Sequence, residues 1–181
     1  MEVLDLLYEE HKVIKRAANV IEVASFQVTK GKDAVDLMLE AAHFLLRFSV
    51  RCHQRKEEEL FFAIFHNRGI LPDILEAMQV DNRAGKDFLR DLSGTLIRYD
   101  GNRISLLPAL LWKSSGYLWF LRHHIKIEED IFFSMARTFF STKEEEMLAK
   151  QFARWELERQ DQRLHMDSDT IIGGWEEELR A

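Results

Sequence analysis

The sequence predicts an all-α protein: an up-down antiparallel four-helix bundle with an additional C-terminal helix. Three observations support this fold class. The chain of 181 residues contains only 2 Pro and 8 Gly, and such sparse breakers are typical of long helices rather than of many short strands. Apolar residues recur at three- and four-residue steps over long segments, which is the spacing of one helix face. We find no convincing alternation of apolar and polar residues, the pattern of a half-buried strand.

The first two helices are expected over residues 3–27 and 33–65, separated by a break at residues 28–32. The inner face of the first helix is Leu4, Leu7, His11, Ile14, Ala18 and Ile21. The inner face of the second is Met38, Ala41, Leu45, Ser49, His53, Glu57, Phe61 and Ile64. Gly69 suits a left-handed C-cap, so the second helix is expected to stop just before it.

The third helix is expected to start near Pro72, a residue that fits the first helical turn. Its inner face is Leu75, Met78, Asn82, Gly85, Leu89 and Leu92, and Ser93-Gly94 either ends or bends this pattern. Asp100-Gly101-Asn102 is expected to form a turn. The fourth helix is expected from about residue 105 to 139, with the inner face Leu110, Tyr117, Leu121, His124, Glu128, Ile131 and Met135.

A fifth helix is expected to begin at Ser141, because Ser141 and Glu144 form a capping-box pattern. It is expected to run to about residue 163, with a tail that contains Gly173-Gly174 and a short charged segment. A length of 181 residues fits one domain. We therefore expect residues 1–140 to form the bundle and residues 141–181 to pack on it as a C-terminal helix and tail of the same domain.

The composition excludes several classes of protein. A net charge of −6 gives no electrostatic footprint for nucleic acid or for an anionic membrane surface. A single cysteine excludes an internal disulfide framework. No apolar run is long enough to span a membrane, and the N-terminus carries acids where a signal peptide needs a basic start. The expected location is therefore the cytoplasm.

The inner faces of the predicted helices carry residues that a packed core normally avoids. His53 and Glu57 are four residues apart, as are His124 and Glu128, so each pair projects from one side of its helix. His11 adds an imidazole from the first helix. A single such histidine is usually a hydrogen-bonded core residue, but two identical pairs and a third histidine favour a shared purpose.

That purpose is expected to be metal binding. Burying an unpaired charge inside a bundle destabilises the fold by an amount on the order of several kcal/mol. Two carboxylates that face each other there are more unfavourable still. A bound cation removes this cost by supplying the missing positive charge. Mixed imidazole and carboxylate ligands suit iron, manganese, zinc or cobalt better than calcium or magnesium.

At these residues the sequence resembles the bacterial hemerythrin-like proteins, the HHE cation-binding domain group. The resemblance rests on Glu10-His11, on the segment from Cys52 to Phe61, and on the segment from His124 to Phe132. The latter two segments share the pattern His-x-x-x-Glu-(Glu/Asp)-x-x-Phe, which begins at His53 in one and at His124 in the other. The resemblance covers nearly the whole chain and implies an up-down bundle around a non-haem iron centre of one or two ions.

By this resemblance the metal ligands are His11, His53, Glu57, His124 and Glu128, with the two glutamates as candidate bridges. Iron is the expected metal, with zinc or manganese as alternatives. Glu129 is an alternative ligand to Glu128. The third helix departs from the family pattern, because Asn82 stands where the family usually has a histidine. Asn82 itself, Asp81 or His165 could complete the site.

The resemblance implies three functional hypotheses. The first is an iron-binding protein that binds or senses iron and a small oxidant: dioxygen, nitric oxide or peroxide. The second is a di-iron oxidase or nitric oxide reductase; it would need an external reductase, because the chain has no flavin or nicotinamide-binding signature. The third is a metal-free bundle that acts as a protein-interaction module, which Asn82 favours. A homodimer partner is also compatible with the sequence.

Overall fold

The computed structural model describes residues 3–99, 103–158 and 162–180. The first helix is α1 (Val3–Thr29). The second is one continuous rod, built from α2 (Val35–Leu45), the π-helical segments η1 (Leu46–Gln54) and η2 (Glu57–Phe62), and α3 (Ala63–Arg68). The third is α4 (Pro72–Arg98), and the fourth comprises α5 (Arg103–Ile127), the π-helical η3 (Glu128–Phe132) and α6 (Phe133–Ala136). The C-terminal helices are α7 (Thr142–Glu158) and α8 (Gln162–Glu178).

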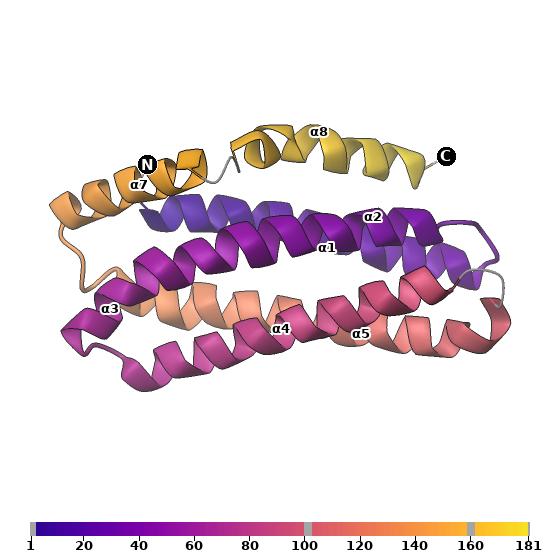
Figure 1. Ribbon diagram of the computed structural model, residues 1–181, viewed down its shortest axis with the longest axis horizontal. Helices are drawn as coiled ribbons and strands as arrows, with labels where there is room; N and C mark the ends of the chain where they lie inside the picture. The colour runs from indigo at the N-terminus through magenta and orange to yellow at the C-terminus, as the bar shows by residue number, and fades with distance from the viewer. Residues whose placement is uncertain (1–2, 100–102, 159–161, 181) are drawn as a thin grey trace.

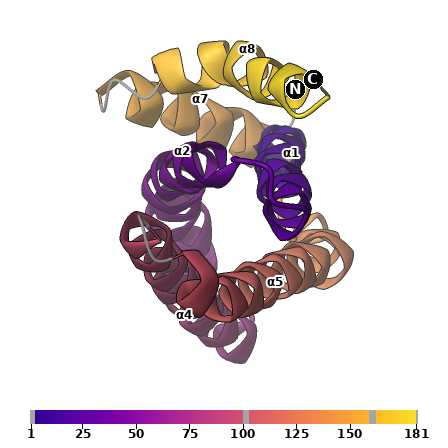
Figure 2. The same ribbon diagram turned by 90° about the vertical axis from the view of Figure 1, so that its right-hand side faces the viewer.

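The first four helical rods surround one central axis. Seen end on, α1, α2, α4 and α5 form a four-sided ring in chain order, and α7 and α8 lie outside it against α1 and α2 (Figure 2). Each rod runs nearly the full length of the molecule, with short connections at alternating ends (Figure 1). This arrangement confirms the predicted all-α bundle with additional helical structure at the C-terminus.

The interior consists of two apolar clusters with a polar layer between them. One cluster contains Ile14, Phe48, Leu89 and Leu121, among others. The other contains Leu7, Phe61, Met78 and Phe132, among others. On every rod the residues between these two sets include buried polar groups, namely His11, His53, Glu57, Asn82, His124 and Glu128. The two clusters stabilise the bundle, and the layer between them is the only part of the described core where polar groups from all four rods gather.

Local signals explain most of the helix ends. Gly69 closes α3 with a φ of 64°, as its predicted C-cap role requires. The capping box at the start of α7 is present: the Ser141 backbone N–H donates to Glu144 Oε2 at 2.9 Å, and the Glu144 N–H lies 3.4 Å from Ser141 Oγ. The predicted turn at residues 100–102 lies outside the described residues.

The C-terminal region differs from the prediction in two respects. The fifth helix, α7, ends at Glu158 rather than near residue 163. Where a tail was expected, α8 is a second helix that continues through Gly173 and Gly174. Leu164, Ile172 and Trp175 of α8 are buried in the first apolar cluster. Burial of this apolar face outweighs the low helix propensity of the two glycines. Ser93 and Gly94 likewise lie within α4 rather than ending it.

Among the described residues, no helix is both long enough and apolar enough to cross a membrane.

Candidate metal centre

The polar layer gathers the predicted ligands from three of the four rods. His11 comes from α1, His53 and Glu57 from the second rod, and His124 and Glu128 from the fourth. All five side chains are at most 4% exposed. Glu57 begins η2 and Glu128 begins η3, so each carboxylate stands at the point where the α-helix becomes a π-helix. Such π segments are frequent at functional sites because they redirect side chains.

Several donor atoms of these residues converge. The Nε2 atoms of His11 and His53 are 3.1 Å apart, and His11 Nε2 lies 3.2 Å from Glu128 Oε2. One donor atom each from His11, His53 and Glu128 lies within 4.8 Å of the others. His124 Nε2 lies 3.2 Å from Glu128 Oε1, and His53 Nε2 lies 3.7 Å from Glu57 Oε2. The structure therefore brings all five predicted residues together in one layer.

The two carboxylates of this layer lie 3.2–3.7 Å from imidazole nitrogens but make no hydrogen bond of ordinary geometry. Within the described part of the chain, no group makes a hydrogen bond to either oxygen of Glu57 or Glu128. Burial and the nearby charge of Glu128 raise the pKa of Glu57 well above its ordinary value. Burial also acts against ionisation of Glu128, but His124 and His11 outweigh it and lower the pKa of that carboxyl. Two fully buried carboxylates with unsatisfied oxygens are unfavourable without a positive charge between them.

Outer partners orient two of the three imidazoles. His53 Nδ1 lies 2.8 Å from Glu10 Oε2, and His11 Nδ1 lies 3.0 Å from Glu129 Oε1. A carboxylate that accepts from Nδ1–H leaves the Nε2 lone pair of the same ring free to bind a cation. For both rings, this Nε2 is the atom that points into the layer. The Nδ1 atom of His124 has no hydrogen-bond partner among the described residues, and its nearest acid is Asp81 at 3.8 Å.

The α4 side of the layer contributes no imidazole. Asn82 is buried, and its amide nitrogen donates to Glu58 Oε1 at 2.9 Å. One turn further along α4, Gly85 leaves room for the Phe120 ring, which a Cβ atom at this position would approach to 2.9 Å. Phe120 in turn stacks on His124, with an angle of 6° between the rings. The space beside His124 is therefore filled by an aromatic ring.

The alternative ligands lie outside this cluster of donor atoms. Glu129 contacts the outer nitrogen of His11 and accepts from Lys15 Nζ at 2.8 Å. His165 lies at the inner surface of α8, where its Nε2 is 3.0 Å from Cys52 Sγ. Asp81 is about one-third exposed and lies on the outer side of His124.

Sequence reasoning missed the outer partners Glu10, Lys56 and Glu156. Glu10 was noted only as the neighbour of His11, although its carboxylate contacts His53 of the next rod. Lys56 is fully buried, and its ammonium contacts both Glu10 and Glu156. No spacing along the chain links these residues, because each contact joins different helices. A lysine on the buried side of a helix one turn after a candidate ligand was the available signal.

The residues present fit a bound cation. The layer offers imidazole nitrogens and unsatisfied carboxylate oxygens, a donor set suited to iron, zinc, manganese or cobalt. A cation there would supply the positive charge that Glu57 and Glu128 lack.

Comparison with known proteins agrees with this geometry. A search of the curated proteins returned no match. The sequence model of one protein family, described as the hemerythrin HHE cation-binding domain, matches residues 2–136. The match spans the four rods and every residue of the polar layer, and it ends where α6 ends, before α7. The chain therefore belongs to the hemerythrin HHE cation-binding domain family.

Proposed function

We propose that this protein binds iron in its polar layer and uses it to bind or sense a small oxidant: dioxygen, nitric oxide or peroxide. The ligands would be His11, His53, Glu57, His124 and Glu128, holding one or two ions. The observation that carries the proposal is the pair of fully buried carboxylates whose oxygens have no hydrogen-bond partner within the described residues, beside converging imidazoles. The proposed setting is the cytoplasm.

Iron held by such ligands supplies a redox-active centre with open positions for a small molecule. The chain's own residues perform the remaining tasks. Glu10 and Glu129 hold the outer nitrogens of His53 and His11, which keeps their inner nitrogens turned to the layer. Phe61 and Phe132, both fully buried, border the layer and exclude bulk water from it.

The α4 side favours reactivity over a closed, structural site. Five ligand side chains cannot fill the coordination spheres of two six-coordinate ions, and Asn82 offers only a neutral amide oxygen. Positions left to solvent are those that a small oxidant can take. If the protein turns over as an oxidase or nitric oxide reductase, it requires electrons from a separate reductase.

Anaerobic titration of metal-free protein with Fe(II) tests this proposal. We expect at least one equivalent to bind, and we expect a change in the visible spectrum when dioxygen or nitric oxide is then added. His124→Ala should abolish most of the binding. His123→Ala is the matched control, because His123 is exposed and stacks on Trp119 instead.

Two results would contradict the proposal. One is less than a tenth of an equivalent of any transition metal in protein purified without chelator, not restored by anaerobic Fe(II). The other is equal Fe(II) binding by His124→Ala and His123→Ala. If His53→Ala and His124→Ala also left the thermal stability unchanged with and without iron, a metal-free interaction module would be the better description.

A further inference from the structure

A buried lysine connects the C-terminal helices to the polar layer. Lys56 lies one helical turn after His53, and none of its side chain is exposed. Its ammonium contacts the carboxylates of Glu10 on α1 and Glu156 on α7. A buried ammonium is costly unless it is paired on all sides, so two carboxylates from two different helices stabilise it here. The ion pairs of Lys56 thus connect the second rod to both α1 and α7.

Glu10 links Lys56 to His53, because each of its two carboxylate oxygens contacts one of these residues. Its Oε1 atom contacts Lys56, and its Oε2 atom lies 2.8 Å from His53 Nδ1. The buried ammonium of Lys56 on the other oxygen favours the charged carboxylate form of Glu10. A carboxylate only accepts hydrogen bonds, so this geometry has His53 donating from Nδ1–H to Glu10. Its Nε2 lone pair then faces His11 and Glu57.

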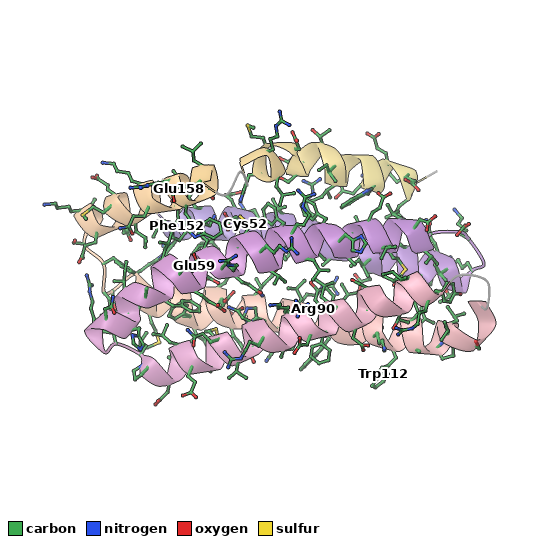
Figure 3. The ribbon with its side chains drawn as sticks, in the orientation of Figure 1. Cys52, Glu59, Arg90, Trp112, Phe152 and Glu158 are labelled. Carbon is green, nitrogen blue, oxygen red and sulfur yellow. The ribbon has the colours of Figure 1, made fainter. Side chains whose placement is uncertain are left out.

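The contacts of α7 with the second rod hold Glu156 in place. Lys56 Nζ lies 5.1 Å from the centre of the Phe152 ring, and Trp155 Nε1 donates to Glu59 Oε2 at 2.8 Å. Figure 3 shows Phe152 and Cys52 on the side of the bundle that α7 and α8 cover. From α8, His165 adds a nitrogen 3.8 Å from Glu10 Oε1. The family match ends at residue 136, so Glu156 and His165 both lie outside it.

The equivalent partner of His11 lacks this connection. Glu129 also contacts a lysine, Lys15, but Lys15 is 41% exposed and Glu129 is 20% exposed. Both charges therefore sit at the protein surface, where solvent screens them. Of the two Lys–Glu–His arrangements, the one at His53 is buried and is shared with α7.

The cluster of Glu10, Glu156 and His165 is also a group that could hold a metal ion, since its donor atoms lie within 4.8 Å of one another. The ammonium of Lys56 already contacts both carboxylates of this cluster. A second cation there would face the repulsion of a buried positive charge. These residues are therefore better suited to orient a ligand than to be ligands.

We propose that Glu10 is a positioning residue for His53 and that Lys56 and Glu156 hold it, so that the C-terminal helix α7 completes the metal centre from outside. The metal-related part of this inference rests on the proposed iron binding. The arrangement makes the affinity of the centre depend on a helix that contributes no ligand.

The test compares Glu156→Gln with Glu158→Gln in the full-length chain. Both substitutions remove one carboxylate charge from the same helix. Glu158 (labelled in Figure 3) is exposed, however, and it pairs with Arg154. Loss of an outer partner of a metal-bound histidine typically costs about 10- to 100-fold in metal affinity. We expect Glu10→Gln to weaken Fe(II) binding by about 10-fold or more and Glu156→Gln by roughly 3- to 10-fold. Glu158→Gln should stay within about twofold of the unsubstituted protein.

A second readout is made on the unsubstituted protein and uses a variant only for assignment. In metal-free protein, the ¹⁵N chemical shifts of the His53 ring, assigned by their loss in His53→Gln, should show the proton on Nδ1. A proton on Nε2 would overturn the inference, as would equal Fe(II) affinities of Glu156→Gln and Glu158→Gln with unchanged far-UV circular dichroism. If the unsubstituted protein binds no Fe(II), the proposed function fails, and the ring shifts still decide whether Glu10 positions His53.

Discussion

At the scale of single residues, the glutamates in and around the polar layer differ in how many positively charged or hydrogen-bonding partners they have. Glu10 and Glu129 each contact both an imidazole and a lysine, whereas Glu57 has no lysine or arginine partner and accepts no hydrogen bond among the described residues. Within the described ranges, the one imidazole or cation at ion-pair distance from Glu57 is His53, whose Nε2 lies 3.7 Å from Glu57 Oε2. Glu57 is therefore the residue whose ionisation the metal-free fold supports least.

We expect Glu57→Gln to change the pH dependence of metal-free protein in a defined direction. The folded-state pKa of Glu57 is raised, so between its unfolded value of about 4.3 and its folded value the native state binds the extra proton. Stability must then fall as pH rises through this window. Glutamine cannot ionise, so Glu57→Gln should flatten this fall and be the more stable protein at pH 7 without metal.

Urea unfolding from pH 4.5 to 7.5 in the presence of a chelator measures this effect. Glu9→Gln serves as the control, because Glu9 is 60% exposed on the surface of α1. The same pH slope in Glu57→Gln and in the unsubstituted protein would contradict the prediction. With Fe(II) added, the order should reverse, because the cation stabilises only the form with both carboxylates.

At the scale of the helices, α4 shows how a missing side chain shapes the site. Gly85 lies where α4 approaches α5, and the Phe120 ring occupies the space that a Cβ would need. Because Phe120 also stacks on His124, the glycine indirectly sets the surroundings of a candidate ligand. The small residue in α4 thus serves packing across the helix pair rather than the helix itself.

Gly85→Ala and Gly94→Ala should therefore have opposite outcomes in the same helix. Alanine exceeds glycine in helix propensity by about 1 kcal/mol. At Gly94 the nearest atom to an added Cβ is the mobile Arg98 Nη1 at 3.6 Å, so we expect a gain of about 0.5–1 kcal/mol. At Gly85 the contact with Phe120 at 2.9 Å forces the ring to move, which costs roughly 1–3 kcal/mol.

Chemical denaturation of the two variants, each compared with the unsubstituted protein, gives both numbers. A gain in Gly85→Ala as large as that in Gly94→Ala would show that Phe120 yields without cost.

At the scale of the whole molecule, the C-terminal helices share the core of the bundle. Phe152 and Leu148 of α7 are buried in the second apolar cluster, and Ile172 and Trp175 of α8 are buried in the first. Ion pairs of Arg16 with Asp169 and Glu176 join α1 to α8 as well. This shared burial supports our proposal that residues 141–181 belong to the same domain as residues 1–140.

Phe152→Ala tests whether α7 and the bundle unfold together as one domain. Truncation of a buried phenylalanine costs about 3–5 kcal/mol, and for a chain of this size each kcal/mol lowers Tm by roughly 2–4 °C. We expect Tm of the entire protein to fall by about 6 °C or more in a single transition. Leu157→Ala, at a side chain that is 62% exposed on the same helix, should change stability by no more than about 0.5 kcal/mol.

Differential scanning calorimetry separates the outcomes. Two transitions, with the main one unchanged by Phe152→Ala, would show that α7 unfolds independently of the bundle.

The sequence by itself determined the helices and the candidate ligands. Apolar residues at helical spacing predicted the four rods, and the two His-x-x-x-Glu pairs with His11 predicted which residues share the interior, because helical periodicity assigns each position to a face. The helical state of α8 escaped this reasoning, since Gly173-Gly174 has a low intrinsic propensity and only burial of Ile172 and Trp175 compensates for it.

The tertiary structure decided which groups surround those ligands. Glu10 contacts His53 rather than its neighbour in sequence, His11, and Glu129 contacts the outer nitrogen of His11. Lys56 contacts both Glu10 and Glu156, and Glu156 lies 100 residues after Lys56 in the chain. These contacts depend on how the helices are rotated and packed against one another, and on π-helical segments that shift side-chain directions. Periodicity along one chain segment carries no information about that rotation, so only the packed structure reveals the charges that orient the site.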